Sequence, residues 1–315
     1  MSSLPPRVTP PPFSLVTFSV ILDDIVLPDG STRMAWLGGG GPQTCFGAQL
    51  FQPADPDQAL AVGITSGVGR DFDPVWFVQS HIDIAGLRFH DSLPTMRAWQ
   101  IIEEDEHRTQ VWRVPMNAVG AHLNRSLNLL PPAYHHAQAF HLGIHPDQPD
   151  VDFMQSVAQL PHRPLISVEV FKGADVLPTR EQLERWLPLC GVFSANAAEA
   201  VSLGAPEDER AAAQWLLDRG AHMAIVRMGR RGSLIADGVQ MVHVPALPVQ
   251  PVLGSVGAGN AYCGAFVVDY LRHGDLTRAG RAGTVAAKLL IEQERLPVVD
   301  EAIRHQANVL MARFA

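Results

Sequence analysis

Four small residues, Gly257-Ala258-Gly259-Asn260, lead directly into an apolar stretch that continues to Leu271. This pattern predicts a tight turn followed by a buried helix. Backbone N–H groups at the start of a helix have no intrahelical partner, and the helix dipole favours an anion there. The turn is therefore a candidate anion site. The alternative is a turn that caps the helix and binds nothing.

Apolar strands and helices alternate from about Ala139 almost to the C-terminus. Such alternation is typical of a mostly parallel sheet covered by helices on both faces. In these sheets ligands bind at the carboxyl ends of the strands. The predicted strands are 139–142, 164–168, 191–194 and 223–227, and the predicted helices are 150–158, 180–189, 197–203, 207–219, 259–271 and 278–293.

The N-terminal part of the chain has shorter apolar segments. Residues 13–26 are predicted to form one buried strand that carries Asp23 and Asp24, and residues 33–37 a short returning strand. Gly38 to Gly41 cannot form regular structure at low cost, so they predict a hinge or the close approach of a ligand. A helix over 44–51 and further strands over 59–65, 84–90, 97–102 and 109–114 complete this part.

Charge and composition exclude several classes of partner. The formal net charge is −8 and no strong basic patch stands out, so we expect no nucleic acid. No apolar run is long enough to cross a bilayer, so we expect no membrane. Cys45, Cys190 and Cys263 lack metal-binding spacing and indicate a reducing, cytoplasmic setting. Residues 1–12, rich in Pro and Ser, are predicted to be a flexible tail before one domain over 13–315.

Six segments follow one another in a recognisable order. They are the strand ending at Asp23, Gly39-Gly40-Gly41-Pro42, Gly67-Val68-Gly69-Arg70-Asp71-Phe72, Asn196-Ala197-Ala198-Glu199, Val226 to Gly232, and Gly257 to Asn260. Together they resemble the ribokinase, or PfkB, family of carbohydrate kinases, and the resemblance covers most of the chain. Residues 192–196, 257–260 and 291–297 also resemble the fungal killer-maintenance PfkB-like proteins, a divergent branch of that family.

The resemblance implies a three-layer α/β/α ribokinase-like fold with a mostly parallel central sheet and a small β lid from about 25–37 and 88–114. It also implies ATP and Mg²⁺, a small-molecule substrate, and a homodimer formed through the lid. The implied nucleotide-binding residues are Asn196, Glu199, Arg227, Gly229 and Gly232, with Glu199 also serving Mg²⁺. The implied substrate-binding residues are Asp23, Gly40, Gly41, Thr44 and Arg97, and the implied catalytic residues are Gly257, Ala258, Gly259 and Asn260.

Asn260 stands where the family has an aspartate that takes the proton of the substrate hydroxyl, and an amide cannot accept that proton. An acid usually found three positions before the turn is also replaced, by Gly254. Three functions follow as alternatives. They are an ATP-dependent kinase for a sugar, polyol or nucleoside, a pseudokinase that only binds its ligand, and a different enzyme that uses a sugar phosphate without ATP.

Several of these residues have a second interpretation. Asn196 and Glu199 have the spacing of a helix capping box, which needs no metal. Asp24 is an alternative to Asp23 as the substrate ligand, and Arg97 fits a solvated surface equally well. The histidines of the region fit no standard zinc motif and are predicted to be turn and surface residues; they are His135, His136, His141, His145 and His162.

Overall fold

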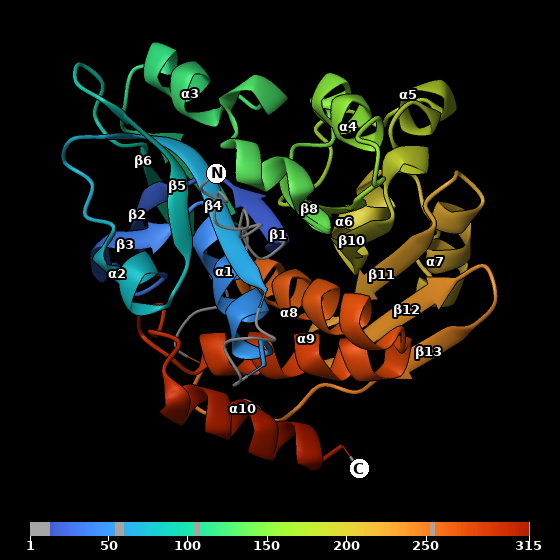
Figure 1. Ribbon diagram of the computed structural model, residues 1–315. Helices are drawn as coiled ribbons and strands as arrows, with labels where there is room; N and C mark the ends of the chain where they lie inside the picture. The colour runs from blue at the N-terminus through green and yellow to red at the C-terminus, as the bar shows by residue number, and fades with distance from the viewer. Residues whose placement is uncertain (1–12, 54–59, 104–107, 253–255, 315) are drawn as a thin grey trace, which may run out of the picture.

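The computed structural model describes residues 13–53, 60–103, 108–252 and 256–314 and places them around two sheets (Figure 1). The large sheet has nine strands in the order β13-β12-β11-β10-β9-β8-β1-β4-β5. β12 is antiparallel to both of its neighbours, and the other pairs are parallel, as predicted. The strands are β1 (Phe13–Phe18), β4 (Ala61–Gly69), β5 (Asp83–His90), β8 (Ala139–Ile144), β9 (Leu165–Val170), β10 (Val192–Asn196), β11 (Met223–Arg227), β12 (Ser233–Asp237) and β13 (Met241–Val244).

Helices cover both faces of this sheet. They are α1 (Gly41–Leu50), α2 (Val75–Gln79), α3 (Met116–Leu123), α4 (Val151–Ala158), α5 (Arg180–Glu184), α6 (Ala197–Ser202), α7 (Glu209–Leu217), α8 (Ala258–His273), α9 (Leu276–Ile291) and α10 (Glu301–Ala312). Buried side chains of α1, α8, α9 and α10 form one core, and those of α4 to α7 form another on the opposite face (Figure 1). No helix in the described ranges is long and apolar enough to cross a membrane.

The two cores divide the side chains of β1 between them. Leu15 packs in the core with α8, whereas its neighbour Val16 packs in the core with α4, and both are fully buried. Successive side chains of a strand point to opposite faces, so a strand buried on both sides must be apolar throughout. This confirms the three-layer α/β/α fold class.

The single strand predicted over residues 13–26 was wrong. Ser19 has a φ of 76° and separates β1 from β2 (Ile21–Val26), which belongs to the small sheet. The chain therefore passes from one sheet to the other at residues 19–20. Val20 N donates to Ser66 Oγ at 3.1 Å, and Gly41 N donates to the Ser19 carbonyl at 3.2 Å, so α1 and β4 hold this crossing in place. A continuous run of apolar residues does not reveal such a break.

The small sheet, which we call the lid, has the order β3-β2-β6-β7, with β3 (Thr32–Gly38), β6 (Arg97–Ile102) and β7 (Arg108–Trp112). β2 and β6 are parallel, and the other two pairs are antiparallel. The lid thus begins before residue 25, and residues 88–90 of the predicted lid lie in β5 of the large sheet. The predicted tail, residues 1–12, lies outside the described residues.

Asp24 ties the lid strands together. It is fully buried, and Arg97 donates to it from Nε at 2.6 Å and from Nη2 at 2.7 Å. Arg113 Nη1 and the Ala35 amide also donate to it. Burial by itself would raise the pKa of Asp24. These hydrogen bonds, led by the one from Arg97, outweigh burial and lower the pKa to about 2. One carboxylate therefore links β2, β3 and β6 to the residue that follows β7.

Asp24→Asn should lower the free energy of unfolding by about 2 kcal/mol, because it weakens charge-assisted hydrogen bonds to two arginines. Since the folded-state pKa lies below the unfolded value, the advantage of the wild type is present above about pH 4 and disappears as the pH falls toward 2. Urea denaturation at pH 7 and at pH 3 measures both effects. Asp91→Asn, in the exposed Arg70–Asp91 pair, is the control and should leave stability unchanged. Equal losses in the two variants would contradict this account.

Candidate active site

A cavity of about 130 Å³ lies where the lid faces the carboxyl end of β1 and the start of α8. We call it the inner cavity. Asp23, Gly40, Gly257 and Asn260, four of the predicted site residues, line it together. The other lining residues are Ser19, Ile21, Gly39, Gln43, Gln100, Gln110, Trp112, Leu123, Arg125, Gly143, Phe171 and Val256.

Asp23 faces this cavity because side chains alternate along β2. Its side chain is almost completely buried, and Gln100 Nε2 donates to Oδ1 at 2.8 Å. Gly38 is required beside it, since a Cβ atom there would lie 1.8 Å from Asp23 Oδ2. The neighbouring strands therefore hold the carboxylate in one position at the edge of the cavity.

Arg97 does not lie in this cavity, so its predicted role in binding substrate is not supported. β2 and β6 are paired so that Leu22 stands beside Arg97 and Asp23 beside Ala98. Arg97 therefore shares the outer face of the lid with Asp24, to which it is bonded, while Asp23 is on the inner face. Gln100, two residues beyond Ala98 and on the same face of β6, is the residue of that strand that reaches Asp23.

Gly40, Thr44 and Asn260 meet although they are far apart in the sequence. Gly40 has a φ of 83°, and a Cβ atom on it would lie 2.9 Å from Asn260 Oδ1. Thr44 Oγ1 donates to the Gly40 carbonyl at 2.9 Å and lies 3.5 Å from Asn260 Oδ1. A hydroxyl has one proton, so the shorter contact takes it. Gly41 packs instead against β1 and β4, since its Cβ would lie 2.5 Å from Ile64 Cδ1.

The start of α8 has the geometry of an anion site. Gly257 is its N-cap, with a left-handed φ of 84°. The Ala261 amide donates to the Gly257 carbonyl at 3.0 Å. Helix geometry leaves the amides that precede Ala261, including those of Ala258 and Gly259, without an intrahelical acceptor. Asn260 therefore carries its amide side chain into the inner cavity from the positive end of this helix. Gly254 lies outside the described residues.

A buried ion cluster lies beside this helix start. Arg227 Nη2 is 2.9 Å from Glu169 Oε1 and 3.1 Å from Glu199 Oε2, and its Nε donates to Ser194 Oγ at 3.1 Å. Burial lowers the pKa of Arg227, but the two carboxylates outweigh burial and raise it above the ordinary value. Gly259 allows this packing, because a Cβ atom there would lie 1.9 Å from Glu169 Oε1 and 2.0 Å from Arg227 Nη1.

Asn196 and Glu199 do form a capping box at the start of α6. The Glu199 amide donates to Asn196 Oδ1 at 2.8 Å, and the Asn196 amide donates to Glu199 Oε2 at 2.6 Å. Glu199 thus caps a helix and pairs with Arg227 at once. Gly232, with a φ of 91°, is required by the hairpin that follows, since its Cβ would lie 2.0 Å from the Val244 carbonyl, while Gly229 has open space around it.

His141 is a correction to the prediction that the histidines of this region lie in turns and on the surface. It is buried in β8, where its Nδ1 lies 2.9 Å from Ser167 Oγ. Burial lowers the pKa of His141 to about 4, although Asn260 opposes the shift, so the ring is neutral at pH 7. Ligand atoms of His141, Glu169 and Cys263 lie within 4.8 Å of one another. Because Arg227 already neutralises Glu169, we assign no metal to this group.

A family model described as pfkB family carbohydrate kinase matches residues 76–297, which include the Gly257–Asn260 turn. The chain belongs to the PfkB family of carbohydrate kinases. The cytidine kinase of Thermococcus kodakarensis is 26% identical over 284 residues, which cover 87% of this chain and 94% of that protein.

Solved structures of the family share the fold. A structure described as a putative ribokinase II from E. coli aligns with a TM-score of 0.74 at 15% identity, over 96% of this chain and 99% of that one. The Arabidopsis thaliana ribokinase, complexed with ribose and ATP, aligns with a TM-score of 0.72 at 19% identity, also over 96% and 99%. Membership of the fungal killer-maintenance branch stays a prediction.

Gly259→Ala should lower the free energy of unfolding by about 1 to 3 kcal/mol, because the added methyl group displaces the Arg227–Glu169 pair. Gly238→Ala is the matched control, since nothing lies within 4 Å of its Cβ position and its φ is not left-handed. Chemical denaturation of both variants measures the difference. A Gly259→Ala variant as stable as the control would contradict the close packing of the ion cluster on α8.

Proposed function

We propose that this PfkB family member transfers the γ-phosphoryl group of ATP to a hydroxyl of a sugar, polyol or nucleoside. One observation carries the proposal. Asp23 and Asn260 line one small cavity at the N-terminal end of α8. A carboxylate that can bind hydroxyls and a helix N-terminus that can bind an anion therefore face the same space. The similarity to a cytidine kinase over nearly the whole chain supports it.

In this mechanism Asp23 accepts a hydrogen bond from one substrate hydroxyl and fixes the sugar ring. Asn260 Oδ1 accepts a hydrogen bond from the reacting hydroxyl and aims its oxygen at the γ-phosphorus. As the new O–P bond forms, the bond to the ADP oxygen breaks, and the amides of Gly257 to Gly259 stabilise the charge on the transferred group. Phosphoryl transfer depends mainly on positioning and electrostatics, so Asn260 contributes without taking the proton.

Asp24 is unsuitable as a replacement base. It lies on the outer face of the lid, and its bonds to Arg97 and Arg113 keep its pKa at about 2. Asp23 is the carboxylate on the cavity side, so it is our candidate to receive the proton, passed on through the substrate hydroxyl that it binds, once the new O–P bond has formed. Burial in the lid and a bond to Gln100 hold it there.

Carboxylates of Glu169 and Glu199 are the ligand type that Mg²⁺ prefers, but both are within 3.1 Å of Arg227. The residues therefore fit a Mg²⁺ that Glu199 would help to hold together with the nucleotide phosphates. Bound there, Mg²⁺ would neutralise charge on the phosphates. Asn196, Gly229 and Gly232 are our proposed neighbours of the nucleotide, at the ends of β10 and β11.

The second candidate function is a pseudokinase that binds sugar or nucleotide without turnover. The specific observation in its favour is that Glu199 is satisfied within the protein, by the capping box and by Arg227. A thermal-shift measurement with ATP and Mg²⁺ tests both candidates, since binding at about 100 times the dissociation constant stabilises by about 2.7 kcal/mol. No shift at millimolar ATP would exclude a nucleotide site.

Asn260→Asp separates the two candidates. In a weakened kinase it should raise kcat by about 100- to 10,000-fold, because it restores a general base. Coupled measurement of ADP release with ATP, Mg²⁺ and a panel of sugars and nucleosides reads this out. Asn128→Asp, the same change at an exposed position, is the control and should have no effect. Ligand binding without turnover in either form would identify a pseudokinase. A fast wild type and an inactive Asn260→Asp variant would mean that Asn260 has its own adapted role.

We also propose that two copies pair through the lid. β3 and β7 are its edge strands, and both carry exposed apolar side chains, Met34 and Val111. Light scattering should give a mass near twice 34.2 kDa, and Val111→Lys should reduce it. A mass of one chain at micromolar concentration would reject the pairing.

A further inference from the structure

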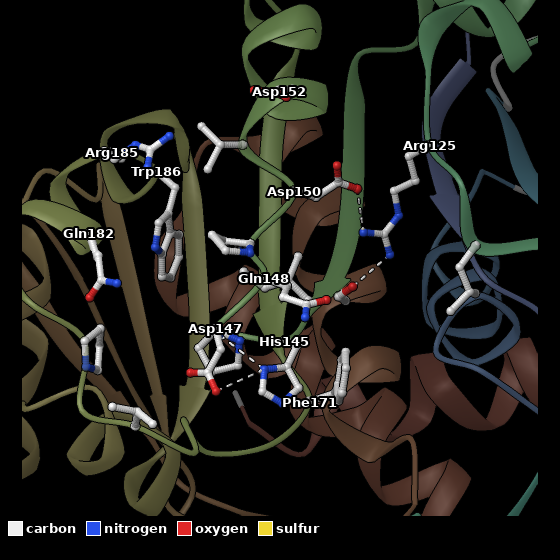
Figure 2. A pocket seen from close by; sticks show the side chains of 18 of the residues that line it. Arg125, His145, Asp147, Gln148, Asp150, Asp152, Phe171, Gln182, Arg185 and Trp186 are labelled. Atoms are coloured by element: carbon white, nitrogen blue, oxygen red, sulfur yellow. Dashed lines mark hydrogen bonds and ion pairs between the residues drawn. The ribbon is translucent and has the colours of Figure 1, made fainter. Parts of the chain in front are cut away.

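A second cavity, of about 770 Å³, adjoins the inner one, and we call it the outer cavity. It is formed by the segments that follow β8 and β9, the first turn of α4, and α5 with the residues after it (Figure 2). Leu123, Arg125, Gly143 and Phe171 line both cavities. The two cavities therefore adjoin along these four residues.

The two volumes suit different parts of one molecule. At about 30 Å³ per water molecule, the inner cavity of 130 Å³ has room for about four waters, which is enough for a small sugar ring only. The outer cavity of 770 Å³ lies within the range of about 300 to 1,000 Å³ that is usual for small-molecule sites. A free pentose would leave the outer cavity unused.

Phe171 stands at the junction. Its ring is 40% exposed, and its side chain comes from the segment directly after β9. A Cβ atom on Gly143 would lie 3.9 Å from Phe171 Cδ1 and 3.9 Å from Asn260 Oδ1. The Phe171 ring and the Asn260 amide thus both lie close to Gly143, where β8 has no side chain. A ligand whose hydroxyl met Asn260 would therefore have Phe171 close to its neighbouring group.

The outer cavity has no surplus of positive charge for a phosphate. Arg125 is already bonded to Asp150, at 3.2 Å, and to the Gly143 carbonyl, at 2.8 Å (Figure 2). His145 lies 3.8 Å from Asp147, and its ring meets Phe171 edge-on at 5.9 Å. The lining also offers amide groups, from Gln148 and Gln182, and the carboxylate of Asp152, against one further arginine, Arg185. Such a lining suits a flat, uncharged ring with hydrogen-bonding edges.

We propose that the substrate is a nucleoside, with its sugar in the inner cavity and its base in the outer cavity against Phe171. The inference rests on the proposed phosphoryl transfer and narrows its substrate class. It excludes a free sugar as the preferred substrate, because nothing would fill the outer cavity. It also disfavours a sugar phosphate, because the three aspartates of the lining outnumber its two arginines, one of which is bonded to Asp150.

Phosphorylation of cytidine, inosine, ribose and ribose 5-phosphate by the wild type tests the substrate class. The nucleosides should have the highest kcat/KM. Phe171→Ala should raise KM for the nucleosides by about 5- to 150-fold, the measured range for loss of base stacking, and leave KM for ribose and ATP unchanged. Phe171→Tyr keeps the ring and should retain wild-type KM. Phe89→Ala is the matched control, since Phe89 is also 40% exposed but does not line either cavity.

A wild type that prefers ribose or ribose 5-phosphate would overturn the inference and leave the proposed kinase activity standing. An equal rise in KM for ribose and nucleosides in Phe171→Ala would also overturn it. If the wild type phosphorylates no acceptor, the proposed function is wrong. Isothermal titration calorimetry then tests directly whether a nucleoside binds and whether its base contacts Phe171. Cytidine or inosine should then bind the wild type and Phe171→Tyr, and bind Phe171→Ala at least 5-fold more weakly. Absence of nucleoside binding to the wild type would overturn the inference there too.

Discussion

Backbone contact between α1 and α8 fixes the position of the whole site. A Cβ atom on Gly47 would lie 1.9 Å from the Ala261 carbonyl oxygen, and one on Gly264 would lie 2.1 Å from the Thr44 carbonyl oxygen. Each helix therefore has a glycine where the other's backbone approaches. Helices that carry larger side chains at the contact pack 8–10 Å apart. The close contact brings Gly40, just before α1, against Asn260 in the first turn of α8.

The lid completes the site through one pair of adjacent residues. Asp24 is held on the outer face by Arg97 and Arg113, and strand geometry then directs Asp23 to the inner face. A buried ion pair carries a desolvation cost that the bond geometry must offset. Here four donated hydrogen bonds meet one carboxylate, and they connect the lid strands. The acid that does not touch the cavity thus positions the acid that does.

The ion cluster beside α8 bears on the missing aspartate. Arg227 adds a positive charge next to a helix end that is already positive, and Glu169 and Glu199 compensate it. Glu169, the last residue but one of β9, places its carboxylate beside Gly259. The carboxylates around the helix start therefore come from β9 and α6, and Asn260 adds none. This is why a single substitution back to aspartate is informative in either direction.

Local sequence patterns predicted most of the alternating strands and helices between β8 and α9. β11 begins and ends at the predicted residues, 223–227, and in the lid β6 does so too, at 97–102. The prediction missed α2, α3, α10 and the β12–β13 hairpin, since no candidate was proposed at 75–79, 116–123, 301–312 or 233–244. It also joined β1 and β2 into one strand, because both are apolar and only the left-handed backbone of Ser19 separates them. Backbone dihedrals at a non-glycine residue are set by packing, which composition does not show.

For the site, the sequence by itself determined which chemical groups are available: a glycine turn before a helix, an acid after an apolar strand, and an amide where a proton acceptor is expected. Only the tertiary structure decided which of them meet. It brought Asp23, Gly40 and Asn260 to one cavity and put Arg97 on the other side of the lid, because alternation along paired strands depends on register. It also added Gln100, Arg125, Gly143 and Phe171, which carry no motif. Their positions follow from long-range packing of strands and loops, and local sequence does not encode that packing.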